Sequence, residues 1–420
     1  MENKWRKIDN TAKLFSLDDI NNTSIFRFSA LLKEEIEPLI LKKAVNKSLE
    51  DYPSFKVKCC SGLFWNYLDY NKKRPIIKEE TEIPCTHINF RKNNDYLFKV
   101  TYYKNKINLD LYHVLTDGAG GIIFLKSIIY HYLSIKYNIK YKKTKYMNIG
   151  YEDCTLKHYD MSYSEKKNKK PTYKIKGMPR NINNTYHYIL DTKEVRKISK
   201  KNKVSVTTYL VSIYMYALYK SLYDKTSNKE LNIIVPINLR PHFQEETMAN
   251  FFTYMNIYSN FNRKENVTFE EILKHVKKEY KEKYTPDKIK SYLASDVSVG
   301  VNIGLRVVPL FIKKFFIRFF GFLRASTTIV SNVGIIELDD KFKNYVDNIL
   351  MLVMPNNIQK IKCSICSYGN KLNVTMNSII NDLHFEKTFY SILREKFDTI
   401  ELISNNDKRS KYVSNKNKWR

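Results

Sequence analysis

The chain has 420 residues, 43% of them hydrophobic and 14% aromatic, which is enough apolar surface for two folded cores and excludes an intrinsically disordered protein. Its net charge of +29 at pH 7 comes mostly from 58 Lys against 14 Arg. Proteins that read nucleic-acid bases favour the forked guanidinium of Arg, and the sequence has no nucleic-acid-binding motif, so we expect a small anionic molecule rather than a nucleic acid as the partner of this positive field.

The first residues and the cysteines indicate the compartment. Residues 1–15 have no apolar stretch of the kind found in secretory signal peptides, so we expect a cytoplasmic protein with reduced thiols. Cys363 and Cys366 have a metal-like spacing, but no second such pair completes a zinc site. Their stretch alternates like a strand, which puts the two sulfurs on opposite faces, so we expect no metal. The remaining cysteines are Cys59, Cys60, Cys85 and Cys154.

The first half of the chain predicts a helix, three strands and a second helix. An apolar stripe predicts a helix over residues 36–52, which Pro53 ends. Residues 55–58, 97–103 and 106–112 alternate like strands, with a tight turn at 104–105 between the last two. Counting by two places His113 at the exit of the last strand, on the side of its apolar residues. Residues 118–138 then read as a helix, and the glycines at 118, 120 and 121 indicate a close backbone approach.

Residues 140–180 are rich in Lys, Tyr and Asn and show little periodicity, so we interpret them as an exposed crossover connection between two halves. In the second half, strands are predicted over residues 186–190, 231–237, 325–333 and 348–354, from 248 onward, and as a hairpin over 360–380. Helices are predicted over 192–201, 205–222, 269–283 and 384–396. Strands and helices interleave in both halves, which favours an α/β fold with mixed sheets, divided into residues 1–180 and 181–420.

The stretch from Val307 to Leu323 is the nearest approach to a membrane-spanning segment. Lys313, Lys314 and Arg318 interrupt it, and their spacing predicts an amphipathic helix. Three interpretations stay open: a helix that packs on the core, a peripheral membrane contact, or a surface that binds an acyl chain.

The run from His113 to Gly118 is an H-x-x-x-D-G motif between a predicted strand and a predicted helix, and it carries the clearest chemistry in the sequence. An imidazole with a pKa near ~6.5 can remove a proton from an attacking hydroxyl or amine at neutral pH. Asp117, four residues on, can set the local geometry directly or through a partner Arg. The alternative is a polar loop with a solvent-facing His.

Several segments, in this order, resemble the chloramphenicol acetyltransferase-like superfamily, which includes the HxxxD acyltransferases, the condensation domains of peptide synthetases, and the alcohol and wax-ester acyltransferases. The matching segments are residues 41–58, the motif from His113 to Gly118, the run P-I-N-L-R ending at Arg240 with Asn250 after it, and the run S-N-V-G beginning at Ser331. The chain is most similar to the bacterial alcohol acetyltransferase-like group.

The resemblance implies two similar lobes with an active-site tunnel between them, and transfer of an acyl group from acyl-CoA to a hydroxyl, less readily to an amine. His113 would be the general base, acyl-CoA a co-substrate, and neither an acyl-enzyme nor a bound cofactor would be needed. Asp117 would bind an Arg in a structural role, with Arg240 as the candidate and Arg27 and Arg324 as alternatives. Further candidates are Gly118 in the motif, Ser331 or Asn332 near the oxyanion, and Asn238, Asn250 and Thr328 along the tunnel.

Two departures from the family pattern narrow this interpretation. Tyr112 stands where condensation domains usually carry a second His, which weakens a peptide-synthetase function. The D-F-G-W-G box of the plant acyltransferases is absent from the sequence. Two alternatives remain: a non-catalytic binding protein with the same fold, and an enzyme that takes its acyl group from a carrier protein. No obligate protein partner is indicated.

Overall fold

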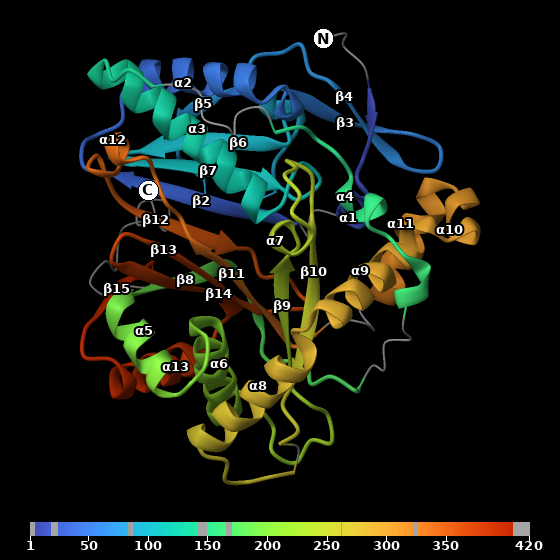
Figure 1. The fold of residues 1–420 in the computed structure, drawn as a ribbon, viewed down its shortest axis with the longest axis vertical. Helices are drawn as coiled ribbons and strands as arrows, with labels where there is room; N and C mark the ends of the chain where they lie inside the picture. The colour runs from blue at the N-terminus through green and yellow to red at the C-terminus, as the bar shows by residue number, and fades with distance from the viewer. Residues whose placement is uncertain are drawn as a thin grey trace.

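The computed structural model describes residues 5–17, 24–82, 84, 87–141, 149–164, 170–261, 263–321 and 326–405. Two β-sheets lie in the middle of the molecule, and helices cover their outer sides (Figure 1). This layered arrangement confirms the predicted α/β fold with mixed sheets, since parallel and antiparallel pairs occur in both large sheets.

The first sheet and its two helices form what we call the N-terminal lobe. Its strand order is β12-β2-β7-β6-β5, and α2 and α3 cover its outer face (Figure 1). The bounds are β2 (Ile25–Leu32), β5 (Ile77–Glu79), β6 (Phe98–Tyr103), β7 (Lys106–Tyr112), β12 (Val346–Val353), α2 (Pro38–Asp51) and α3 (Gly118–Tyr137). The predicted hairpin is confirmed, with Lys104 in the turn at a φ of 49°. The strand β2, which lies between β12 and β7, was not predicted.

Helix α3 begins directly after the motif and packs against α2 as a core helix. By length and apolar composition it could also cross a membrane, but 56% of its most apolar window is buried inside the protein. Such burial is what a central helix of a folded lobe shows. Asp117 caps its first turn by accepting a hydrogen bond from the Gly120 amide at 3.0 Å.

The second large sheet and its helices form the C-terminal lobe. Its strand order is β10-β9-β11-β13-β14-β8-β15, and α5, α6 and α13 lie on the side away from the first sheet (Figure 1). The strands are β8 (Pro179–Asp191), β9 (Asn232–Asn238), β10 (Phe252–Tyr258), β11 (Thr328–Ile335), β13 (Ile361–Tyr368), β14 (Lys371–Ile380) and β15 (Ile400–Ser404). The helices are α5 (Thr192–Lys201), α6 (Val206–Ser221), α8 (Phe269–Lys283), α9 (Pro286–Val301) and α13 (His384–Lys396).

Smaller elements connect these layers. A short sheet of order β1-β4-β3 lies beside the N-terminal lobe. The remaining elements are β1 (Arg6–Lys7), β3 (Val57–Ser61), β4 (Asn66–Tyr70), α1 (Asn10–Phe15), α4 (Cys154–Lys157), α7 (Arg240–Phe243), α10 (Ile303–Val307), α11 (Leu310–Gly321), α12 (Asp340–Lys343), and the 3₁₀ turns at Pro53–Phe55, Arg91–Asn93 and Met161–Tyr163.

The division of the chain at residue 180 needs a correction, because β12 belongs to the N-terminal lobe. It pairs antiparallel with β2 from Val346 opposite Leu32 to Val353 opposite Phe26, and its side chains join that lobe's core. The connection before residue 180 also departs from the exposed linker that we expected. Tyr173 and Ile175 are buried in the core of the C-terminal lobe, and Thr172 forms a β-bridge with Glu230.

The two cysteines of the C-x-x-C spacing lie on opposite faces of β13, as their separation predicts. Cys363 is buried in the core of the C-terminal lobe and Cys366 in that of the N-terminal lobe. Burial raises the pKa of both thiols, that of Cys366 to about 12. The pair therefore packs both lobes together and cannot share one metal ion. Cys85 lies outside the described residues.

The predicted helix from Val307 to Leu323 is divided at Pro309 into α10 and α11, and its end lies outside the described residues. Its orientation also differs from that of a helix packing its apolar side on the core. The Lys313 side chain is buried, and its ammonium donates to the Phe64 carbonyl at 2.8 Å and lies 3.8 Å from the Trp65 ring centre. Phe311 and Phe315, by contrast, are 72% and 68% exposed.

Candidate functional site

The motif lies where the two lobes meet. β9 and β11 are paired at Thr328 and Ile329, beyond which β11 continues along β13 instead. The segment between β9 and β10, residues 239–251, leaves the C-terminal lobe at this point and reaches the start of α3; we call it the crossing segment (Figure 1). Thr116 donates to the Met248 carbonyl at 2.8 Å, which is one of several bonds that join the motif to this segment.

His113 extends from the end of β7 into this junction and keeps part of its surface accessible. Its Nδ1 lies 3.0 Å from Asn250 Oδ1, and the Asn250 amide nitrogen donates to the His113 carbonyl at 2.9 Å. Three phenyl rings surround the imidazole. Phe15 is stacked on it with ring centres 4.4 Å apart, and Phe26 and Phe252 lie at 4.8 and 5.5 Å. The ring is thus held at one nitrogen and shielded on its faces by apolar groups.

This environment sets the charge of His113. Burial lowers the pKa of the imidazole, and the positive charge of Lys362 on β13 lowers it further. The hydrogen bond with Asn250 and the negative charge of Asp117 raise it in part, but the net pKa stays below the usual value. The imidazole is therefore neutral at pH 7 and able to accept a proton.

Asp117 ties the two lobes together. Its Oδ2 accepts from the Arg240 guanidinium at 2.8 Å and from the Phe251 amide at 2.8 Å, while Oδ1 accepts from Gly120. Burial acts to raise the pKa of Asp117, but Arg240 and these hydrogen bonds outweigh it and leave the pKa below its usual value. The carboxylate thus stays ionised and acts as a scaffold.

Arg240 is the arginine that binds Asp117, as the P-I-N-L-R run indicates. It also donates to the Thr247 carbonyl through Nε and Nη2, and to the Ala249 carbonyl at 2.8 Å. Arg27, the first alternative, is buried elsewhere and binds Asp110 and Glu80. Arg324 lies outside the described residues.

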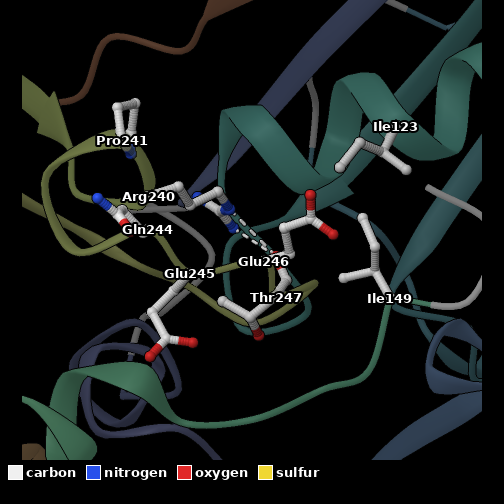
Figure 2. A pocket seen from close by; sticks show the side chains of 8 residues that line it. All are labelled: Ile123, Ile149, Arg240, Pro241, Gln244, Glu245, Glu246 and Thr247. Carbon is white, nitrogen blue, oxygen red and sulfur yellow. Dashed lines mark hydrogen bonds between the residues drawn. The ribbon is translucent and has the colours of Figure 1, made fainter. Parts of the chain in front are cut away.

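Figure 2 shows the pocket on the outer side of the Asp117–Arg240 ion pair. Arg240 binds Thr247 there, and Ile123, Gln244 and Glu246 also line the wall. His113 is not among its lining residues, so this pocket lies behind the scaffold rather than at the base.

Next to this pocket, Glu152, Cys154 and Glu245 are close enough to hold a metal ion. Glu245 is already paired with Lys157 and His158 at 2.8 and 2.7 Å, and burial raises the pKa of the Cys154 thiol to about 11, so this cluster is an ion-pair network.

Two glycines at the start of α3 make close contacts. A Cβ on Gly120 would lie 2.0 Å from Thr116 Oγ1, the hydroxyl that binds the crossing segment. A Cβ on Gly118 would lie 3.0 Å from a methyl group of Val333. The S-N-V-G run therefore does meet the motif across the lobe junction, as the sequence predicts.

The residues of that run point in two directions. Val330 is buried in the C-terminal core, and alternate residues of a strand face opposite sides, so Ser331 shares the side of Val333 toward the motif. Asn332 faces the other way, where its side chain donates to Thr207 of α6 at 2.8 Å and accepts from the Gly334 amide. Of the two oxyanion candidates, the geometry favours Ser331, while Asn332 anchors the strand.

The three tunnel candidates have different positions. Thr328 is fully buried, donates to the Ile361 carbonyl at 2.6 Å and is bonded to Tyr214 of α6, so it is held inside the C-terminal lobe. Asn238 is exposed and accepts from the backbone amide of Arg240. Asn250 is at the site, but as the partner of His113.

Sequence reasoning missed three residues close to the base. Asp9 accepts from both nitrogens of Asn250, Phe15 stacks on His113, and Lys362 contributes positive charge to it. The first two lie in a segment without strong periodicity. The sequence does contain a signal for Lys362, because it shares one side of its strand with Ser364 and Cys366. The side chains of these two residues bond to Met351 and Ile349 of the other lobe, so this side of the strand faces the lobe junction.

Solved structures similar to this one include trichothecene 15-O-acetyltransferase TRI3 from Fusarium sporotrichioides, with a TM-score of 0.61 at 10% identity over 93% of this chain and 94% of that chain. F. graminearum TRI101 complexed with ethyl coenzyme A gives a TM-score of 0.63 at 9% identity over 95% and 99%. The starter condensation domain of rhizomide synthetase, complexed with C8-CoA and Leu-SNAC, gives 0.60 at 9% identity over 93% of both chains. These likenesses show the fold.

No curated protein matches the chain in sequence. The sequence profile of the alcohol acetyltransferase family matches residues 134–397, which is more than half of the chain. The match begins inside α3, after the His113 motif, and covers the crossing segment and β11. The chain therefore belongs to the alcohol acetyltransferase family and is an acyltransferase.

Proposed function

We propose that this acyltransferase transfers an acyl group from acyl-CoA to a hydroxyl acceptor, with His113 as the general base. The observation that carries the proposal is the position of His113 at the lobe junction, with Nδ1 bound to Asn250, a lowered pKa and part of its surface accessible. Among the residues that the structure describes, none forms a hydrogen bond to Nε2, so this nitrogen is available to the acceptor.

The reaction follows from this geometry. Nε2 takes the proton of the acceptor hydroxyl as its oxygen attacks the thioester carbonyl, and a tetrahedral intermediate forms. The Ser331 hydroxyl, which faces the motif, donates to the developing oxyanion. The intermediate then expels the CoA thiolate, which takes the proton back from the imidazolium, so that no covalent enzyme intermediate is formed.

Two features support the choice of substrates. The three phenyl rings around His113 favour an acceptor whose hydroxyl is attached to an apolar group, because a hydrated charged amine would lose its water there. The net charge of +29 attracts the phosphates of CoA. TRI3, which is an O-acetyltransferase, and TRI101, which was solved as a complex with ethyl coenzyme A, have the same fold as this protein.

The test is a thiol-release assay with a series of acyl-CoA donors of increasing chain length and a panel of primary alcohols. We expect His113→Ala to lower kcat by a factor of about 100 or more. His384→Ala is the matched control, because His384 is exposed at the start of α13. Unchanged turnover in His113→Ala would overturn the assignment. Turnover with acyl-carrier protein but not with CoA would instead identify a carrier-dependent donor, and binding without turnover a non-catalytic protein.

We also propose that α10 and α11 contact an anionic lipid surface. Val307 at the end of α10, and Phe311 and Phe315 four residues apart on α11, are all at least 64% exposed, whereas Lys313 of α11 points inward. Arg306, next to Val307 in sequence, adds positive charge beside these exposed apolar residues, and it lies close enough to Lys13 to lower the pKa of that ammonium, after the larger effect of burial. Exposed apolar residues beside a cation fit the interface of an anionic membrane.

A further inference from the structure

The N-terminal segment with β1 and α1 is folded into the catalytic junction. Asp9, just before α1, is 1% exposed, and its carboxylate is surrounded by donors. Oδ1 accepts from the Ala12 amide at 2.7 Å. Oδ2 accepts from the Tyr151 hydroxyl at 2.8 Å, and from the side-chain and backbone nitrogens of Asn250 at 3.0 and 3.3 Å.

These contacts fix the orientation of the Asn250 amide. Its nitrogen donates one hydrogen to Asp9 Oδ2 at 3.0 Å and the other to the His113 carbonyl at 2.9 Å. An ionised carboxylate and a carbonyl can only accept hydrogen bonds, so the reverse orientation of the amide would place an oxygen against two acceptors. The amide oxygen must therefore face His113 Nδ1, at 3.0 Å.

The same logic extends to the imidazole. Because Asn250 Oδ1 can only accept, the hydrogen bond exists only if His113 Nδ1 carries the ring proton. The neutral ring then has its lone pair on Nε2. The other neutral tautomer would place two lone pairs against each other at Nδ1 and would leave Nε2 protonated and unable to act as a base.

We propose that Asp9 and Asn250 are positioning residues that hold His113 in the tautomer with the proton on Nδ1, so that the N-terminal segment is part of the active site. Asp9 acts through Asn250, and Asn250 acts on the imidazole. The inference rests on the proposed role of His113 as the base, but its first readout, the position of the ring proton, is independent of turnover.

Further contacts show that this segment is built to hold the ring. Phe15, at the other end of α1, is stacked on the imidazole with an interplanar angle of 24°. Tyr112, beside His113 in sequence, donates to the Phe15 carbonyl at 2.6 Å. Asp153 accepts from the Asn10 amide at 2.7 Å, and the Arg6 guanidinium lies 3.6 Å from the Tyr151 ring centre. The segment therefore contacts one face and, through Asn250, one edge of the base.

Several charged groups lie around the contacts that join Asp9, Asn250 and His113. Asp9 is near Arg6, Lys13 and Asp153, and its pKa is raised to about 6 by burial. His113 is affected by Asp117 and Lys362. At pH 7.5 Asp9 is ionised and is a pure acceptor, which is the state that the amide orientation needs, so the experiment is done at this pH.

The experiment uses the full-length protein labelled with ¹⁵N in histidine, with Asn250→Ala, Asp9→Ala and the double variant. Asp153→Ala is the matched control, because it removes a hydrogen bond to the same segment without contacting Asn250. In the unchanged protein and in the control, the imidazole ¹⁵N shifts should show the proton on Nδ1. In both single variants, a mixture of the two tautomers should appear.

Steady-state kinetics provide the second readout. The loss of one buried hydrogen bond is expected to lower kcat about 10-fold in each single variant, while the KM for acyl-CoA changes less than about 2-fold. The double variant should be no worse than Asn250→Ala, because Asp9 acts through Asn250. Asn250→Asp should lower kcat as well, because its second carboxylate oxygen would face Asp9 Oδ2 and the His113 carbonyl, and both of these groups can only accept.

The outcomes are distinguishable. An unchanged tautomer in both Asp9→Ala and Asn250→Ala overturns the positioning role, as do effects that multiply in the double variant. If Asp9→Ala does not fold, Asn250→Ala carries the same test. Full activity of His113→Ala overturns the proposed function alone, whatever the tautomer data show.

Discussion

Replacing Arg240 by Met, or Asp117 by Asn, should destabilise the protein strongly, because each change leaves its partner buried and unpaired. The side chains of Arg240 and Asp117 are 11% and 6% exposed, and Arg240 Nη1 lies 2.8 Å from Asp117 Oδ2. In Arg240→Met, Asp117 keeps its bonds from Phe251 and Gly120 but loses the compensating charge. In Asp117→Asn, the NH2 group must face either the two donors at Oδ2, which are Arg240 and the Phe251 amide, or the Gly120 amide at Oδ1.

Breaking a buried ion pair by removing one partner costs about 3–5 kcal/mol. The lower end applies here, because the pocket in Figure 2 adjoins Arg240 and Thr247 and lets water reach the carbonyls that Arg240 leaves behind. We therefore expect each single variant to lose about 3 kcal/mol in the free energy of unfolding. The double variant Asp117→Asn with Arg240→Met should lose clearly less than the sum, since no charge is then left unpaired.

The assay is urea unfolding followed by tryptophan fluorescence and by far-ultraviolet circular dichroism. The control is Lys73→Met, which removes an ion pair of 2.6 Å with Asp95 whose Lys is 55% exposed, and which should change the free energy by less than about 1 kcal/mol. Losses below about 1 kcal/mol in both single variants, or additive losses in the double variant, would refute a scaffold role for this pair.

Three further predictions concern pH and membranes. Because burial lowers the pKa of His113, the acidic limb of kcat should lie below pH ~6.5, and a limb above pH 7 in a pH–rate profile would contradict this. Burial also lowers the pKa of His187 to about 3. Below pH ~6.5, His187 therefore binds a proton in the unfolded chain but stays neutral in the folded protein, so its contribution to the free energy of unfolding falls as pH falls. Between pH 6.5 and pH 5 this contribution amounts to about 2 kcal/mol, and it should appear as the difference in the free energy of urea unfolding between the unchanged protein and His187→Gln over this range. In sedimentation with phosphatidylserine vesicles, Phe311→Glu should reduce binding, whereas Leu39→Glu, on the exposed surface of α2, should not; equal binding of both variants would exclude lipid contact through α11.

The sequence predicted the elements whose pattern is strong. α2, α3, α5 and α13 have clear helical spacing or caps, and the β6–β7 and β13–β14 hairpins have clear alternation and turns. β2 was missed because its inward side carries Arg27 and Ser29, which are buried through bonds to Asp110, Glu80 and Asn108 that no local pattern reveals. Buried polar residues of this kind make a strand look like a loop.

The site was predictable only where one motif contains it. His113, Asp117 and Gly118 are neighbours in sequence, and the order of the later segments pointed to Arg240 and Ser331. Asp9 was out of reach, because its bond to Asn250 joins residues 241 positions apart. The burial of Lys313 was equally hidden, since the Trp65 ring and the Phe64 carbonyl that receive it lie about 250 residues away.

The placement of β12 has a consequence for how the protein is made. One edge of β2 finds its partner only when residues 346–353 have left the ribosome. Until then the emerging N-terminal half has an unpaired strand edge and lacks part of its core, which is a state prone to aggregation. The slowest step of folding should therefore be the return of β12 to a sheet begun more than 300 residues earlier, and a ribosome stalled before that strand should carry a half that chaperones must protect.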